Sequence, residues 1–103
     1  MSTGTSELPP LANLFSEPSR WTKEHYAKDS HGVSTFATAD NAVCFCLLGG
    51  VRLCYDFLEV PEIEMKLENV LAARGFSGSL ANWNDAPKRT VEEVVALCIE
   101  AGV

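Results

Sequence analysis

The sequence predicts a mainly helical α+β domain, in which three to four helices form a small bundle around a buried central helix and a short β-hairpin lies near residues 24–37. Three observations lead to this prediction. Residues 40–57 form an almost uninterrupted apolar segment, residues 90–102 begin and end with helix-capping signals, and residues 29–32 form a cluster of turn formers. A chain of 103 residues with 47% hydrophobic side chains is long enough to bury one core without metals or disulfides.

The N-terminal region divides into a tail and the start of the domain. Residues 1–10 are small and polar and end in two prolines, so we expect a flexible tail there and a single globular domain over residues 11–103. Leu11, Leu14 and Phe15 share one face of a short helix or turn. Aromatic and β-branched residues flank the turn cluster Asp-Ser-His-Gly on both sides, which favours the hairpin.

The central helix is expected over residues 40–57, where Arg52 is the only charge in the interior of the segment. A helix with no polar face is one that the rest of the fold surrounds. Gly49 and Gly50 lower its helix propensity by about 1 kcal/mol each relative to alanine. We therefore expect a neighbouring backbone or aromatic ring to approach closely at these glycines.

Two further helices and one helical turn are expected after the central helix. Pro61 opens a helix that Gly75 stops, and its narrow apolar stripe predicts a place on the surface. Residues 79–84 are expected to form a helical turn that places Trp83 inward. The last helix starts at Thr90, because Thr90-Val-Glu-Glu has the pattern of a capping box, and it ends at Gly102.

Several functional classes are disfavoured by composition. The longest apolar run covers only residues 42–51, whereas a membrane-spanning helix needs about 20 apolar residues. The N-terminus has no basic and apolar secretion signal, so we expect a cytoplasmic protein with reduced thiols. No C-x-x-C pair is present and the two histidines fit no zinc-ligand spacing, so no metal or other cofactor is expected. The net charge of −6 argues against direct nucleic-acid binding.

Three motifs resemble one known family. They are the Trp21…Tyr26-Ala27-x-Asp29 region, the Cys-Phe-Cys-Leu-x-Gly string at residues 44–49, and Trp-Asn-Asp-x-Pro-x-Arg-Thr at residues 83–90. Together they resemble a family of small bacterial and phage proteins catalogued as a domain of unknown function, DUF6197. The chain departs from the family pattern at Phe45, where tryptophan is commoner, and at Gly50, where alanine is commoner. The resemblance implies no activity, but it implies an origin in a phage or another mobile element.

Acidic residues concentrate between residues 56 and 68. This segment holds five acids against Lys66 alone, so it carries −4 of the net charge of −6. Part of this charge has a structural explanation, because acids favour the start of a helix and Glu62 can pair with Lys66 one turn later. The segment is nevertheless the preferred candidate for contact with a basic protein surface. The candidate partner-binding residues are Asp56, Glu59, Glu62, Glu64 and Glu68.

The loop of residues 83–90 is the alternative site, formed by Trp83, Asn84, Asp85 and Arg89. Asp85 could act as a catalytic carboxylate and Arg89 as an anion clamp. A structural interpretation is favoured, in which Asn84 and Asp85 bond their own backbone in a turn, and Asp85 and Arg89 pair across it. The cysteines are likewise better explained as packing residues than as nucleophiles.

Two functions follow from these candidate sites. The first is a small non-enzymatic protein-binding module, specifically a phage or mobile-element inhibitor of a host defence complex such as a CRISPR effector, which binds a basic, nucleic-acid-handling partner through its acidic residues. The alternative is a small enzyme or ligand-binding protein that uses the loop of residues 84–89 with Tyr26, Asp29 or His25 from the hairpin. A homo-oligomer that pairs through exposed apolar residues of the hairpin or N-terminal segment is a third possibility.

Overall fold

The computed structural model describes residues 8–103, so residues 1–7 of the expected tail lie outside the described residues. The described chain contains five α-helices, one 3₁₀-helix and a three-stranded antiparallel sheet, which confirms the predicted α+β class. In chain order the elements are α1 (Pro10–Phe15), η2 (Pro18–Arg20), β1 (Ala27–Lys28), β2 (Ser34–Thr35), β3 (Cys44–Phe45), α2 (Leu47–Cys54), α3 (Val60–Ala73), α4 (Leu80–Asp85) and α5 (Val91–Ala101).

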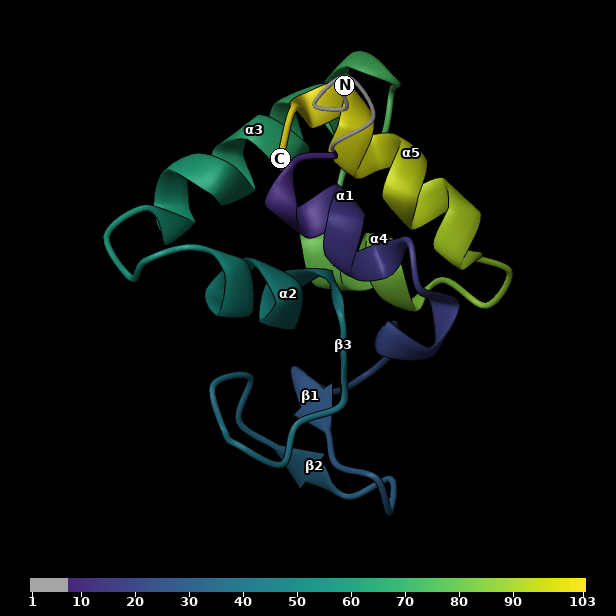
Figure 1. Cartoon of the computed structure of the whole chain (residues 1–103). Helices are drawn as coiled ribbons and strands as arrows, with labels where there is room; N and C mark the ends of the chain where they lie inside the picture. Colours follow the sequence, from purple (N-terminus) through teal and green to yellow (C-terminus); the bar gives the residue numbers. More distant parts are fainter. Residues whose placement is uncertain (1–7) are drawn as a thin grey trace, which may run out of the picture.

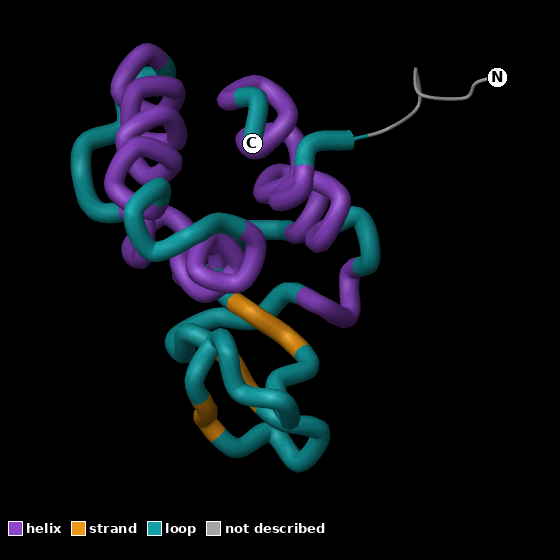
Figure 2. Tube along the Cα trace, turned by 60° about the vertical axis from the view of Figure 1, so that its left-hand side comes forward, coloured by secondary structure: helices purple, strands orange, loops and turns teal. Residues whose placement is uncertain are grey.

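The helices form the larger part of the molecule, and the small sheet forms a lobe at one end of it (Figure 1). Helix α1 packs on α5 and α2, and α3 packs on α5 and α2. The backbone N–H of Leu11 donates a hydrogen bond of 2.6 Å to the carbonyl oxygen of Val103, which joins the two ends of the described chain. Seen from the side, β3 runs from the sheet directly into the helical part (Figure 2).

The predicted central helix is much shorter than expected. Helix α2 covers only Leu47–Cys54, and the preceding apolar residues form β3 instead. Cys46 separates the two elements and caps α2, since its sulfur accepts a hydrogen bond from the Gly49 N–H. A short buried strand followed by a buried helix gives the same continuous apolar run as one long helix. The helix is also not surrounded on all sides, because Arg52 and Leu53 are exposed.

The close approach expected at the two central glycines is confirmed. A Cβ atom at Gly49 would overlap the backbone carbonyl of Tyr26, which comes just before β1. A Cβ atom at Gly50 would lie 2.8 Å from side-chain atoms of both Leu11 and Phe15 in α1. The sheet lobe and α1 can therefore contact α2 only because these positions carry no side chain.

The predicted hairpin is present as β1 and β2, which pair Ala27 with Thr35. Its turn is fixed by Asp29, whose Oδ1 accepts hydrogen bonds from the backbone N–H groups of His31 and Val33 at 2.8 and 3.0 Å. The third strand was not predicted. β3 pairs with the other edge of β1, so the strand order is β2-β1-β3.

The later elements agree with expectation. The α3 stripe is buried at Ile63, Leu67 and Leu71, and α4 places Trp83 in the core. The capping box of Thr90 at the start of α5 is formed, and the left-handed φ of 74° at Gly102 ends the helix. Among the described residues, no helix is long and apolar enough to cross a membrane.

Candidate functional site

The five acidic candidates lie at the turn between α2 and α3 and along α3, but two of them are engaged in ion pairs. Glu64 is half-buried and pairs with Arg52 of α2 at 3.2 Å, a contact between elements that the sequence did not reveal. Glu62 pairs with Lys66 at 3.6 Å, as its spacing predicts. Within the described residues, the side chains of Asp56, Glu59 and Glu68 make no ion pair.

Two large apolar side chains stand among these acids. Phe57 and Leu58 are 87% and 86% exposed, and they occupy the turn between Asp56 and Glu59. Glu59 folds back, so that its Oε1 accepts a hydrogen bond of 3.2 Å from the Asp56 N–H and closes the turn. The turn is thereby held in a shape that keeps both apolar side chains in solvent.

A hollow of about 800 Å³ lies beside this turn. Its lining is mostly apolar and comes from the end of α2, the turn and the start of α3, including Leu53, Tyr55 and Val60. Sequence reasoning missed it because residues up to Phe57 were assigned to a buried helix. The available signal was the pair Phe-Leu between two acids, three residues before the helix-opening proline.

We use the term acidic-apolar face for Asp56, Phe57, Leu58, Glu59, Glu64 and Glu68, together with this hollow. Glu62 is left out, because it lies two positions before Glu64 and points to another side of α3. Arg52 forms its edge. Its Nη1 donates to Glu64 and to the Leu48 carbonyl oxygen at 3.1 Å, and its guanidinium lies 4.9 Å from the centre of the Tyr26 ring. Arg52 therefore connects α2, α3 and the sheet lobe.

The alternative site is dominated by Asn84, which is fully buried. Its Oδ1 accepts hydrogen bonds from the Trp21 indole at 2.7 Å and from the Leu47 N–H at 3.1 Å, while its Nδ2 donates to the Thr22 carbonyl oxygen at 3.1 Å. The expectation that Asn84 bonds its own turn is therefore wrong. Buried amides are satisfied by any donors and acceptors in reach, and here these come from distant segments.

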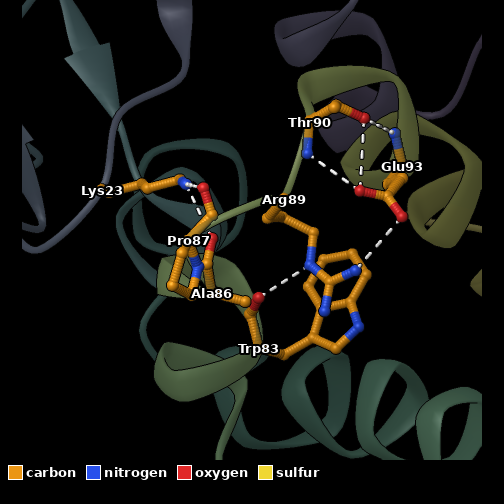
Figure 3. A network of polar contacts seen from close by, with 7 residues as sticks. All are labelled: Lys23, Trp83, Ala86, Pro87, Arg89, Thr90 and Glu93. Atoms are coloured by element: carbon orange, nitrogen blue, oxygen red, sulfur yellow. Dashed lines mark hydrogen bonds and ion pairs between the residues drawn. The ribbon is translucent and has the colours of Figure 1, made fainter.

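Arg89 and Asp85 do not pair across the loop. The Arg89 guanidinium stacks 3.9 Å from the centre of the Trp83 ring, and its Nε donates to the Trp83 carbonyl oxygen at 2.8 Å (Figure 3). Its Nη1 contacts Glu93 at 3.3 Å. Lys23 donates to the carbonyl oxygens of Ala86 and Pro87, so the loop is fixed from both sides (Figure 3).

Asp85 instead faces the segment before β1. Its Oδ1 accepts hydrogen bonds from the backbone N–H of Glu24 at 2.9 Å and from Asn84 Nδ2 at 2.9 Å. A second hollow of about 310 Å³ forms there, and its walls include Asp85, Glu24, His25 and Tyr26. The structure thus brings together three of the residues named for the alternative function. Asp29 is occupied in its own turn and Arg89 lies outside this hollow.

The thiols are placed in packing environments. Burial raises the pKa of Cys46 and Cys54, and it raises the pKa of Cys98 to about 12. All four cysteines are free. Cys44, Cys46 and Cys54, which the predicted central helix would hold together, are divided, because Cys44 lies in β3, Cys46 precedes α2 and Cys54 ends α2. Across residues 8–103, no three His, Cys, Asp or Glu side chains gather closely enough to hold a metal ion.

Fold and surface together define a small helical α+β domain with one acidic-apolar face and one smaller acidic hollow. A family model matches residues 11–102, and the chain belongs to that family, the family of unknown function DUF6197. No curated protein and no solved structure matches the chain.

Proposed function

We propose that the protein is a small non-enzymatic module that binds a basic protein surface through its acidic-apolar face. The observation that carries the proposal is the exposure of Phe57 and Leu58 between Asp56 and Glu59. Large apolar side chains that remain in solvent next to a hollow are typical of protein-binding surfaces. Acidic neighbours set the partner chemistry, because they attract Lys and Arg and repel anionic surfaces.

The most specific form of the proposal is an inhibitor of a host defence complex, encoded by a phage or mobile element. Nucleic-acid-handling complexes such as CRISPR effectors expose channels rich in Lys and Arg, which bind phosphates. Carboxylates of the acidic-apolar face would occupy such a channel in place of phosphates, while Phe57 and Leu58 would contribute apolar contact. The concentration of −4 of the net charge in residues 56–68 supports this form.

The test begins with capture of partners from cell extract, followed by purification of each captured protein and cross-linking of the complex. Two variants separate the contributions: Asp56→Lys/Glu59→Lys reverses charge, and Phe57→Ser/Leu58→Ser removes the apolar side chains. Glu17→Lys/Glu92→Lys is the matched control, since both residues are exposed and lie outside the acidic-apolar face.

We expect cross-links within residues 56–68, and we expect each of the two face variants to weaken binding about tenfold or more while the control variant binds normally. A partner whose cross-links map elsewhere, or one that binds all variants equally, would contradict the proposal. The specific form is tested separately with a purified CRISPR effector. If micromolar protein leaves binding of its target DNA unchanged, the inhibitor form fails while the general binding function stands.

A further inference from the structure

The smaller hollow is built from four separate parts of the chain. Glu24 and Tyr26 come from the segment that enters the sheet, and Ser34 comes from β2. Leu48 comes from α2, and Ala81 and Asp85 come from α4. Its volume of about 310 Å³ is at the lower end of the range for sites that hold a small molecule or a single long side chain. It shares no lining residue with the hollow of the acidic-apolar face.

The charge in this hollow is negative. Its lining residues include two acids, Glu24 and Asp85. Asp85 uses Oδ1 for its two hydrogen bonds, and no described residue donates a hydrogen bond to its Oδ2 or to the Glu24 carboxylate. His25 also lines the hollow. Of the nearby lysine and arginine side chains, Lys23 binds two loop carbonyls and Arg52 pairs with Glu64.

The rest of the lining suits an alkyl group. Leu48 and Ala81 provide aliphatic surface, and the Cys46 side chain is buried beside them with its thiol protonated, because burial raises the Cys46 pKa. The Tyr26 ring is half exposed at the wall and already accepts one cation, the guanidinium of Arg52. An aromatic ring next to carboxylates favours organic cations.

The Asp85 carboxylate is held in position by hydrogen bonds from the Glu24 N–H and from Asn84. Glu24 has a φ of 71°, which a residue with a side chain rarely adopts, and the hydrogen bond from its N–H to Asp85 holds this conformation. The same hydrogen bond keeps the backbone of Glu24 next to the Asp85 carboxylate. The Asp85 carboxylate and the Glu24 backbone are therefore in place before any ligand arrives, while the exposed Glu24 side chain is free to close on the cation.

We propose that this hollow binds an alkyl cation, with its ammonium or guanidinium group between Glu24 and Asp85 and its apolar stem on Leu48 and Ala81. Two kinds of ligand present this chemistry: a free alkyl amine, and a Lys or Arg side chain of another protein. The site is independent of the acidic-apolar face, so either proposal can fail while the other stands.

The test is a titration followed by backbone amide NMR, with four probes in two matched pairs. n-Butylammonium is compared with neutral 1-butanol, and Nα-acetyl-lysine N-methylamide is compared with its norleucine analogue. We expect saturable shifts of the amides around the hollow with the cations and not with their neutral partners. A stronger response to n-butylammonium indicates a free amine, whereas a stronger response to the lysine probe indicates a protein side chain.

Two substitutions then test the residues. Asp85→Asn removes the charge but keeps the Oδ1 acceptor. Glu24→Gln removes the charge of an exposed side chain. If Asp85→Asn fails to fold, Glu24→Gln alone decides the test. Each substitution is expected to lower the affinity for the cation about tenfold, and Glu17→Gln is expected to leave this affinity unchanged. Equal shifts with the neutral probes, or unchanged affinity in Glu24→Gln, would overturn the proposal.

Discussion

The indole Nε1 of Trp21 donates a 2.7 Å hydrogen bond to Oδ1 of Asn84, a residue 63 positions later in the chain. The same oxygen receives the N–H of Leu47 at the start of α2. One buried amide therefore joins the entrance to the sheet lobe, the first turn of α2 and the end of α4. No local sequence pattern indicates such a three-way contact.

Asn84→Ala tests the importance of this contact. The substitution leaves the Trp21 and Leu47 donors and the Thr22 carbonyl oxygen without their partner, so we expect the free energy of unfolding to fall by about 3 kcal/mol. Urea unfolding followed by tryptophan fluorescence measures the change. Asn82→Ala is the control, because Asn82 is exposed on the same helix, and it should change stability by less than about 0.5 kcal/mol. Equal stability of both variants would refute the role of Asn84.

Gly49→Ala tests the close packing of the sheet lobe on α2. Alanine has a higher helix propensity than glycine, but here its methyl group would overlap the backbone carbonyl of Tyr26. We expect a loss of about 3 kcal/mol, against about 1 kcal/mol for Gly50→Ala, whose methyl group meets the side-chain ends of Leu11 and Phe15 rather than a backbone carbonyl. Thermal unfolding of the two variants provides the comparison, and a stabilised Gly49→Ala would show that the two segments do not touch.

Arg89→Lys distinguishes a structural from a chemical role for the loop arginine. Lysine keeps the charge but cannot both stack on Trp83 and donate from Nε to its carbonyl oxygen. The expected loss is about 1–2 kcal/mol in chemical denaturation. Lys88→Ala is the neighbouring control, since Lys88 is exposed and makes no side-chain hydrogen bond or ion pair within the described residues. A fully stable Arg89→Lys would mean that these contacts do not hold the loop.

Thiol modification should follow burial. The pKa of Cys98 is raised to about 12, so almost none of it is thiolate at neutral pH, and its side chain is fully buried. We expect iodoacetamide to leave Cys98 unmodified in the folded protein and to modify all four cysteines in denaturant. Mass spectrometry of peptides against time reads this directly, and rapid native labelling of Cys98 would contradict the packing described for α5.

Stability should decrease in acid partly because of Glu93. The Thr90 N–H holds the pKa of Glu93 below its ordinary value of 4.5, so the unfolded state binds this proton more readily than the folded state. The contribution of Glu93 to the free energy of unfolding is complete above pH 4.5, and it is lost as the pH falls through the lower pKa of Glu93 in the folded state. Unfolding measured across this range should depend less on pH in Glu93→Gln than in the wild type. Glu92→Gln, one residue earlier and exposed, should keep the wild-type pH dependence.

Local rules predicted the elements that depend on local chemistry. The capping box of Thr90, the turn at Asp29 and the inward position of Trp83 are each determined within a few residues, and each is found where the sequence places it. The close approach at Gly49 could also be expected, since a glycine in a helix usually has a packing reason.

The remaining features depend on distant contacts. The strand β3 and helix α2 together have the pattern of one long helix, because both are apolar in sequence and hydrophobic periodicity cannot divide such a run. This error also concealed the exposed turn, because the predicted helix extends to Phe57. The ion pair of Arg52 with Glu64 and the hydrogen bonds of Asn84 join elements that only the tertiary fold brings together.

The two-residue strands of the sheet have a thermodynamic consequence. Strands this short form few hydrogen bonds and contribute little stability of their own. The lobe is therefore held in place mainly by its contacts with the helices at Asn84, Gly49 and Arg52. The walls of the smaller hollow come from both parts, and the hollow exists only while the lobe is attached. By linkage, whatever occupies it must favour the attached state and slow the hydrogen exchange of the lobe amides.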